Sequence, residues 1–132
     1  MNIINGYPPN IETLRKHFDI QPTVIFTYGN DLYNPAGKDI PAHLMVHESV
    51  HAEQHRTYPS GASAWWGRYI ADKKFRLEQE VEAYRAQYKF LIEHCNRDFR
   101  RRVVPQIIRD LSSGIYGNIV TAGEAEALIC GD

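Results

Sequence analysis

The sequence lacks the features that mark several common classes of protein. Its two cysteines, Cys95 and Cys130, lie far apart and form neither a metal-binding nor a redox pattern. We therefore expect reduced thiols in an intracellular protein, although the spacing leaves a bridge between them open. No apolar run is long enough to span a membrane, and the N-terminus lacks the pattern of a signal peptide. These absences predict a chain that is neither secreted by the standard route nor partnered with a membrane.

The chain also has little net charge. Fifteen basic and 16 acidic residues give a formal charge of −1, which provides no argument for a nucleic acid partner. We interpret the one basic cluster, Arg97 with Arg100, Arg101 and Arg102, as a solvated helix face. With 43% apolar and 23% charged residues, the 132 residues predict a single globular domain over residues 1–132.

The most informative segment is His47-Glu48-Ser49-Val50-His51. Residues four apart on an α-helix lie on one face, about 6 Å apart along the axis, so two imidazoles there can bind one zinc ion. The carboxylate of Glu48 then points to the side of the metal where a bound water would lie. Two histidine ligands followed by a general base are the helix signature of a zinc metallopeptidase.

The residues around this segment predict the helix that the chemistry requires. Pro41 fits the first turn, and Asp39 or Ile40 lies near the cap. From Ala42 to about Arg56 the chain has neither Gly nor Pro, and the breakers of residues 58–61 then end the run.

Two further histidines, His43 and His55, continue the same four-residue spacing. Each step along this ladder rises about 6 Å and turns about 40°, so one ion can bind only two adjacent members. Of the adjacent pairs, only His47 and His51 have a carboxylate directly after the first member. His55 is either a residue that supports the ligands from outside or a structural one, and for both His43 and His55 we favour polar helix positions near the mouth of the site.

A third ligand must come from a later segment, and a long helix predicted over residues 76–95 offers three glutamates. Taking the centre of its apolar stripe as zero, Glu80 lies about 60° away, Glu78 about 100° and Glu82 about 140°. Glu80 is therefore the favoured ligand and Glu78 the alternative, while Glu82 is expected to be solvated and to pair with Arg85 or Arg76. The stripe consists of Leu77, Val81, Tyr84, Tyr88, Leu91, Ile92 and Cys95.

At this point the chain resembles the gluzincin group of zinc peptidases, and more closely the small phage and mobile-element peptidases of the ImmA/IrrE and minigluzincin kind. Their motif His-Glu-x-x-His-x-x-x-His is matched by residues 47–55, and their Glu-x-x-Ala by residues 80–83. The resemblance covers roughly residues 22–92 and implies that His47, His51 and Glu80 bind zinc and that Glu48 activates water. It also implies an intracellular or phage-associated location. Tyr84 departs from the Asn or Asp that usually follows the second motif.

The same chemistry needs a donor for the oxyanion that forms when water attacks the peptide carbonyl. Tyr116, flanked by glycines, and Tyr84, one turn from Glu80, are the two candidates, and the sequence does not choose between them. For either tyrosine a buried hydroxyl with a structural partner is the favoured interpretation. Trp65-Trp66, between the two metal helices, either lines the substrate cleft or closes a core.

The pattern as a whole predicts an α+β fold in which a short N-terminal sheet precedes a mostly helical remainder. In gluzincin-like folds an edge strand binds the peptide substrate by strand addition, a role that falls by resemblance to Ile25–Tyr28 or Leu32–Tyr33. The predicted strands are residues 1–4, 23–28 and 32–33. The predicted helices are residues 10–18, 42–56, 76–95 and 98–111, followed by a last helix with a capping box of Thr121 and Glu124. Residues 60–67 are predicted to form a connection between the two metal helices.

Three readings of the function follow. The favoured one is a zinc-dependent endopeptidase whose partner is a peptide or protein substrate. A second is a zinc-stabilised or vestigial domain that binds a partner and cleaves nothing. The third is an adaptor or assembly protein in which the motif is accidental and Glu80 faces solvent.

Overall fold

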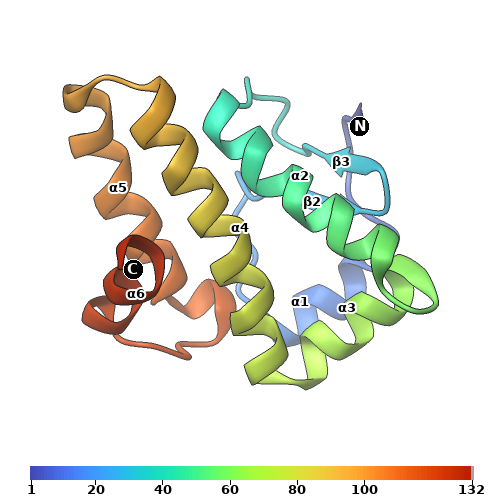
Figure 1. Cartoon of the computed structure of the whole chain (residues 1–132). Coiled ribbons are helices and arrows are strands. Elements are labelled where there is room, and N and C mark those ends of the chain that lie inside the picture. The colour runs from blue at the N-terminus through green and yellow to red at the C-terminus, as the bar shows by residue number, and fades with distance from the viewer. Residues whose placement is uncertain (132) are drawn as a thin grey trace.

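The computed structural model describes residues 1–131 (Figure 1). Within these residues, three strands form a small sheet near the N-terminal end, with one helix between the first two strands, and five helices follow, which confirms the predicted α+β class. Helices α2 and α4 run side by side through the centre, and α5 and α6 lie on the far side of α4 from α2 (Figure 1). Within residues 1–131, no helix combines the length and apolar character needed to cross a bilayer.

The sheet has three strands: β1 (Asn2–Ile4), β2 (Phe26–Tyr28) and β3 (Asp31–Tyr33). Their order is β1-β3-β2, with β1 parallel and β2 antiparallel to β3. The tight turn between β2 and β3 contains Gly29 at φ +63°, a conformation that favours glycine. The strand predicted over 23–28 is confirmed only for its last three residues. Val24 and Ile25 instead line a cavity beside helix α2.

Helices α1 (Ile11–His17) and α2 (Ala42–Thr57) agree with the predicted ranges, but their first residues differ in detail. Asn10 precedes α1, and its side chain makes no capping bond. Pro41, in an extended conformation, is the N-cap of α2, so the N-cap is neither Asp39 nor Ile40.

The connection predicted over residues 60–67 is wrong, because helix α3 (Gly61–Ala71) begins there. Ser60 and Gly61 have φ of +69° and +78° and make the sharp turn that separates α3 from α2. Trp65 and Tyr69, four residues apart, are both buried on one face of α3. Tertiary burial of these rings outweighs the weak helix propensity of the Gly- and Ser-rich start.

Helix α4 (Lys73–His94) begins three residues before the predicted start because the Asp72 side chain accepts a bond from the backbone N–H of Phe75. Helix α5 (Arg97–Leu111) is capped in the same way by Asn96. A short 3₁₀ turn, η1 (Gly114–Tyr116), leads to helix α6 (Ala122–Cys130). The predicted capping box of Thr121 and Glu124 is confirmed.

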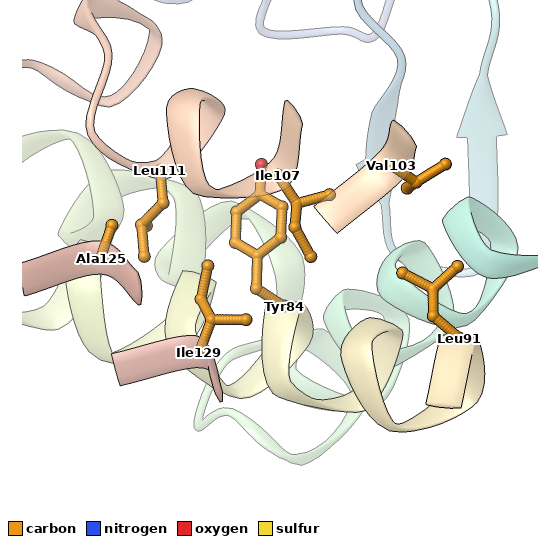
Figure 2. Packing of buried hydrophobic residues seen from close by; sticks show 7 residues of the cluster. All are labelled: Tyr84, Leu91, Val103, Ile107, Leu111, Ala125 and Ile129. Carbon is orange, nitrogen blue, oxygen red and sulfur yellow. The ribbon is translucent and has the colours of Figure 1, made fainter. Parts of the chain in front are cut away.

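Helices α4, α5 and α6 enclose an apolar cluster, here called the C-terminal core (Figure 2). The ring of Tyr84 lies among the aliphatic side chains of α5 and α6, and Leu91 faces Val103 at the other end of the cluster (Figure 2). Cys95 and Cys130 pack against it as free thiols. The C-terminal core consists of Tyr84, Leu91, Val103, Ile107, Leu111, Ala125 and Ile129.

Candidate metal centre

Helices α2 and α4 bring two imidazoles and one carboxylate to a single point. The Nε2 atoms of His47 and His51 lie 3.2 Å apart. Oε1 of Glu80 lies 3.1 Å from the first and 3.2 Å from the second. All three side chains are buried, and together they could hold a metal ion. The structure thus places the three predicted ligands on one site, with Glu80 on the inward face of α4 as the helix angles predicted.

The chemistry of this donor set fits a divalent cation. Donor atoms about 2.0–2.2 Å from one tetrahedral metal lie a little more than 3 Å from one another, which matches the observed separations. Burial by itself disfavours a charged His51, but Glu80, and more weakly Glu48, outweigh it and raise the pKa of His51 to about 9. Burial likewise opposes a charge on Glu80, yet the two histidines hold its pKa well below its ordinary value. A positive charge therefore stabilises this pocket, whether it comes from a proton on His51 or from a metal ion.

The second oxygen of Glu80 accepts a bond from Tyr69, whose hydroxyl lies 2.6 Å from Oε2. Burial, followed by the charge of Glu80, raises the pKa of Tyr69 well above its ordinary value, so the phenol stays a donor. This bond fixes the orientation of the carboxylate, so that Oε1 faces the Nε2 atoms of His47 and His51. Sequence reasoning missed Tyr69 because it lies on α3, which was not predicted as a helix.

The other two glutamates of α4 are not part of the cluster. Glu78 is exposed. Glu82 is exposed as predicted, but the predicted pairing with Arg85 or Arg76 is wrong: Oε1 of Glu82 accepts from Nε2 of Gln54 at 3.1 Å. The two arginines donate instead to backbone carbonyls, Arg85 near the end of α6 and Arg76 at the end of α3 and at η1.

Glu48 is buried beside the cluster and lies on the wall of the same cavity as His47, His51 and Glu80. Its Oε2 accepts a bond from the Thr27 hydroxyl at 2.9 Å. Thr27 comes from β2, so the sheet fixes the carboxylate from the side opposite α4. A β-branched hydroxyl in a predicted strand before the motif is an available signal, but many such residues have no role at a site.

Two glutamine side chains lie within hydrogen-bond distance of the Nδ1 atoms of His47 and His51, the ring nitrogens that face away from Glu80. Oε1 of Gln87 lies 3.0 Å from Nδ1 of His47, and Oε1 of Gln54 lies 2.8 Å from Nδ1 of His51. Both amides are buried. Sequence reasoning missed them because glutamine is common on helix surfaces and its spacing here is unremarkable.

The two candidate tyrosines form one pair, with hydroxyls 2.7 Å apart. Tyr116 lines the cavity together with Glu48 and the three cluster residues, whereas Tyr84 does not line it. Tyr84 packs its ring 4.3 Å from the ring of His47 and belongs to the C-terminal core. Burial raises the pKa of both phenols well above the ordinary value, so both stay protonated. Tyr116 is therefore better placed to reach a ligand in the cavity.

The two remaining histidines of α2 differ from each other. His43 is half-buried, and its Nδ1 lies 2.8 Å from Nε2 of Gln87. His55 is only 2% exposed, so its predicted place near a site mouth is wrong. Its Nδ1 accepts the backbone N–H of Gly29 at 3.0 Å, and its ring packs 4.3 Å from that of Trp65. The structural role predicted for His55 agrees with these contacts.

The cavity beside the cluster has a volume of about 90 Å³. The Trp65 and Trp66 side chains form part of its wall, and Trp65 also centres an aromatic cluster with Tyr69 and Phe75. The predicted role of the pair in closing a core is therefore confirmed, and both indoles also line this cavity. The remaining wall is apolar and comes mainly from the segment between α1 and β2, through Phe18, Ile20, Val24 and Ile25.

The sheet leaves one of the two proposed peptide-binding strands at an edge. Residues 32–33 belong to β3, which pairs on both sides, so this alternative is wrong. Strand β2 is an edge strand, but Nε1 of Trp66 donates to the carbonyl of Thr27 at 3.0 Å. One of the few backbone groups that β2 could offer a peptide is therefore occupied.

Comparison with known proteins gives no relative from which a role could be transferred. No protein-family model matches the chain, and no curated protein and no solved structure matches it either. What the chain contains is a buried His47, His51 and Glu80 cluster that could bind a metal ion.

Proposed function

We propose that the chain is a zinc-dependent endopeptidase of the small gluzincin type. The observation that carries the proposal is the position of Glu48. This carboxylate lies on the wall of the same cavity as the three candidate ligands and is held there by Thr27. A buried site that served only to hold a metal would have no need of a further carboxylate beside it.

Zinc is the metal that the donor set favours. Two imidazoles and one carboxylate are the protein ligands of several catalytic zinc sites, which keep one further position open. Sites that prefer magnesium or calcium are built from oxygen ligands. The cluster has two nitrogen donors among three, so the proposed metal is a borderline-soft ion.

The residues around the cluster then have distinct tasks. When bound, zinc acts as a Lewis acid that makes water acidic near neutral pH and polarises a carbonyl. Glu48 takes the proton from the attacking water and passes it to the nitrogen of the leaving amine as the C–N bond breaks. Tyr116, protonated and on the cavity wall, donates to the oxyanion. Tyr84 holds the Tyr116 hydroxyl in place.

A peptide cannot enter the cavity as it stands. Sites for small organic ligands usually have volumes of about 300–1,000 Å³, and this one has about 90 Å³. The apolar segment of residues 18–25 forms much of the wall, so entry of a substrate requires this segment to move away from α2.

The same small volume favours a second candidate function, a zinc-stabilised binding domain without catalysis. In that case the metal would contribute folding free energy, and Glu48 would have no chemical task. The two functions predict the same metal content and differ in whether the protein cleaves peptides and in the effect of changing Glu48.

The test is the cleavage of a peptide library by metal-loaded protein, followed by mass spectrometry of the products. Glu48→Gln keeps the size of the side chain but removes the base, and we expect cleavage to fall at least about 10²-fold. Exposed Glu53 on the same helix provides the matched control, because Glu53→Gln changes the same charge away from the cavity. Bound zinc, measured by elemental analysis, should be equal in all three proteins.

Cleavage that is the same in wild-type protein and Glu48→Gln would exclude the peptidase and leave the binding domain. Protein that binds no zinc, when prepared without chelator, would exclude both.

A further inference from the structure

Gln54 lies one turn after His51 on α2, and its two amide atoms have different partners. Nε2 lies 3.1 Å from the backbone carbonyl of Gln79 and 3.1 Å from Oε1 of Glu82. Both partners can only accept, so the NH₂ group must face α4. Oε1 then faces Nδ1 of His51 at 2.8 Å and can only accept. His51 therefore carries a proton on Nδ1, and its Nε2 is the atom that faces Glu80.

Gln87 makes the corresponding contact from α4. Its Oε1 lies 3.0 Å from Nδ1 of His47, and its Nε2 lies 2.8 Å from Nδ1 of His43. Burial, followed by the charge of His47, lowers the pKa of His43, so His43 is neutral at pH 7 and can accept from the amide. With Oε1 facing His47 and Nε2 facing His43, the amide of Gln87 has the same orientation as that of Gln54.

Resting on the metal centre proposed above, we propose that Gln54 and Gln87 are positioning residues that fix both histidines in the tautomer whose Nε2 binds the metal. Neutral imidazole has two tautomers, and the wrong one directs an N–H at the metal. An acceptor on Nδ1 excludes that tautomer, and it also orients the ring and raises the basicity of Nε2. Each amide spans the gap between α2 and α4, so the two helices set the tautomers together.

The two amides are not equivalent, because their outer partners differ. The NH₂ group of Gln54 donates to the carboxylate of Glu82, whereas the NH₂ group of Gln87 donates to the neutral ring of His43. A negative partner on the NH₂ side polarises the amide and makes its oxygen a stronger acceptor. Removing Gln54 should therefore weaken metal binding more than removing Gln87. This gives Glu82 a role through Gln54 although it does not touch the cluster.

A glutamine that only stabilises the fold can be distinguished from one that positions a histidine by the effect of its loss on metal affinity. Loss of a buried hydrogen bond lowers the free energy of unfolding but leaves the metal affinity of the folded protein unchanged. Gln79 provides the matched control, because its side chain lies on α4 and accepts from the Trp65 indole at 2.9 Å without touching an imidazole. Gln79→Leu thus removes a comparable bond from the same region.

The experiment measures the zinc dissociation constant by competition with a chromophoric chelator for wild-type protein, Gln54→Leu, Gln87→Leu and Gln79→Leu. Changes in such outer partners typically cost 10- to 100-fold in metal affinity, and we expect this loss for Gln54→Leu, a smaller loss for Gln87→Leu and less than threefold for Gln79→Leu. Long-range ¹H–¹⁵N spectra of the zinc-loaded protein identify the protonated ring nitrogen directly. We expect protonated Nδ1 on His47 and His51 in wild-type protein.

A change of charge at Glu82 tests whether the chain of bonds itself matters. Glu82→Gln keeps a carbonyl oxygen that can accept from Nε2 of Gln54 but removes the negative charge, so zinc affinity should fall, and by less than in Gln54→Leu. Equal affinities of Gln54→Leu and Gln79→Leu, or protonated Nε2 in the wild-type spectra, would overturn the inference. If the wild-type protein binds no zinc at all, it is the proposed metal centre that fails, and this inference fails with it.

Discussion

Two parts of the interior that meet at helix α4 differ in their chemistry, and an aromatic cluster around Trp65 lies beside one of them. The C-terminal core is aliphatic apart from the ring of Tyr84 (Figure 2). On the other side of α4, every buried side chain of α2 is polar: His47, Glu48, His51, Gln54 and His55. We call this set, with Glu80 and Gln87 of α4, the metal-side interior.

The difference shows that burial alone stabilises the C-terminal core, whereas the stability of the metal-side interior depends on hydrogen bonds and opposite charges. Burying aliphatic surface contributes about 25 cal/mol per Å² regardless of direction. Burying imidazoles and carboxylates costs free energy unless each group finds a hydrogen bond or an opposite charge. We therefore expect the C-terminal core to tolerate loss of the metal and the metal-side interior to depend on it.

Removal of the proposed metal should give the largest effect. A ligand present at about a thousandfold excess over its dissociation constant stabilises the folded state by about 4 kcal/mol. We expect chelation to lower the free energy of unfolding by about this amount, and to speed amide hydrogen exchange in α2 more than in α5. Calorimetry and exchange mass spectrometry with and without chelator test this. Uniform acceleration in both helices would contradict the proposed division.

The converse change removes packing from the C-terminal core. Leu91 is fully buried on α4, about three turns beyond Glu80. Leu91→Ala should lower the free energy of unfolding by about 3 kcal/mol through lost burial and a residual cavity. Chemical denaturation of the metal-loaded protein measures this, and the zinc dissociation constant of the folded variant should stay within threefold of wild type. A tenfold weaker affinity would show that the two halves are coupled.

The remaining prediction concerns acid stability and depends on His55. Burial, and next the charge of a protonated His51, lower the pKa of His55 from 6.5 to about 3. Between these values the unfolded chain binds a proton that the folded chain excludes, so stability is complete above pH 6.5 and falls as the pH drops towards 3. One such group contributes a slope of up to about 1.4 kcal/mol per pH unit.

We expect His55→Gln to reduce that slope between pH 4 and 6, as measured by urea unfolding without added metal. Exposed His17 offers the control, since His17→Gln should leave the slope as it is in wild-type protein. Equal slopes in wild type and His55→Gln would mean that the acid sensitivity comes from the other groups of the metal-side interior.

Much of this organisation could be predicted from the sequence, because periodicity and spacing report on single helices. The spacing of His47 and His51 and the angle of Glu80 on its helix depend only on helix geometry, and the structure places all three together. The capping box of Thr121 and Glu124 could be predicted for the same reason, because both of its bonds join residues three positions apart.

What could not be predicted depends on contacts between elements distant in the sequence. Helix α3 forms because Trp65 and Tyr69 are buried against other elements, which no local propensity indicates. Tyr69, Thr27 and the two glutamines are assigned to the site only when α3, β2 and α4 are brought together. The burial of His55 depends likewise on the turn at Gly29 and on the aromatic rings of α3.

The placement of the tryptophans has an optical consequence. The chain has only two, and both line the cavity. The ring of Trp65 lies 5.5 Å from that of His51, and the two indoles are 5.0 Å apart. All of the intrinsic indole fluorescence therefore originates within a few ångströms of the metal-side interior, and none originates in the C-terminal core. A change of charge at His51, or movement of residues 18–25, would alter the emission without any added label.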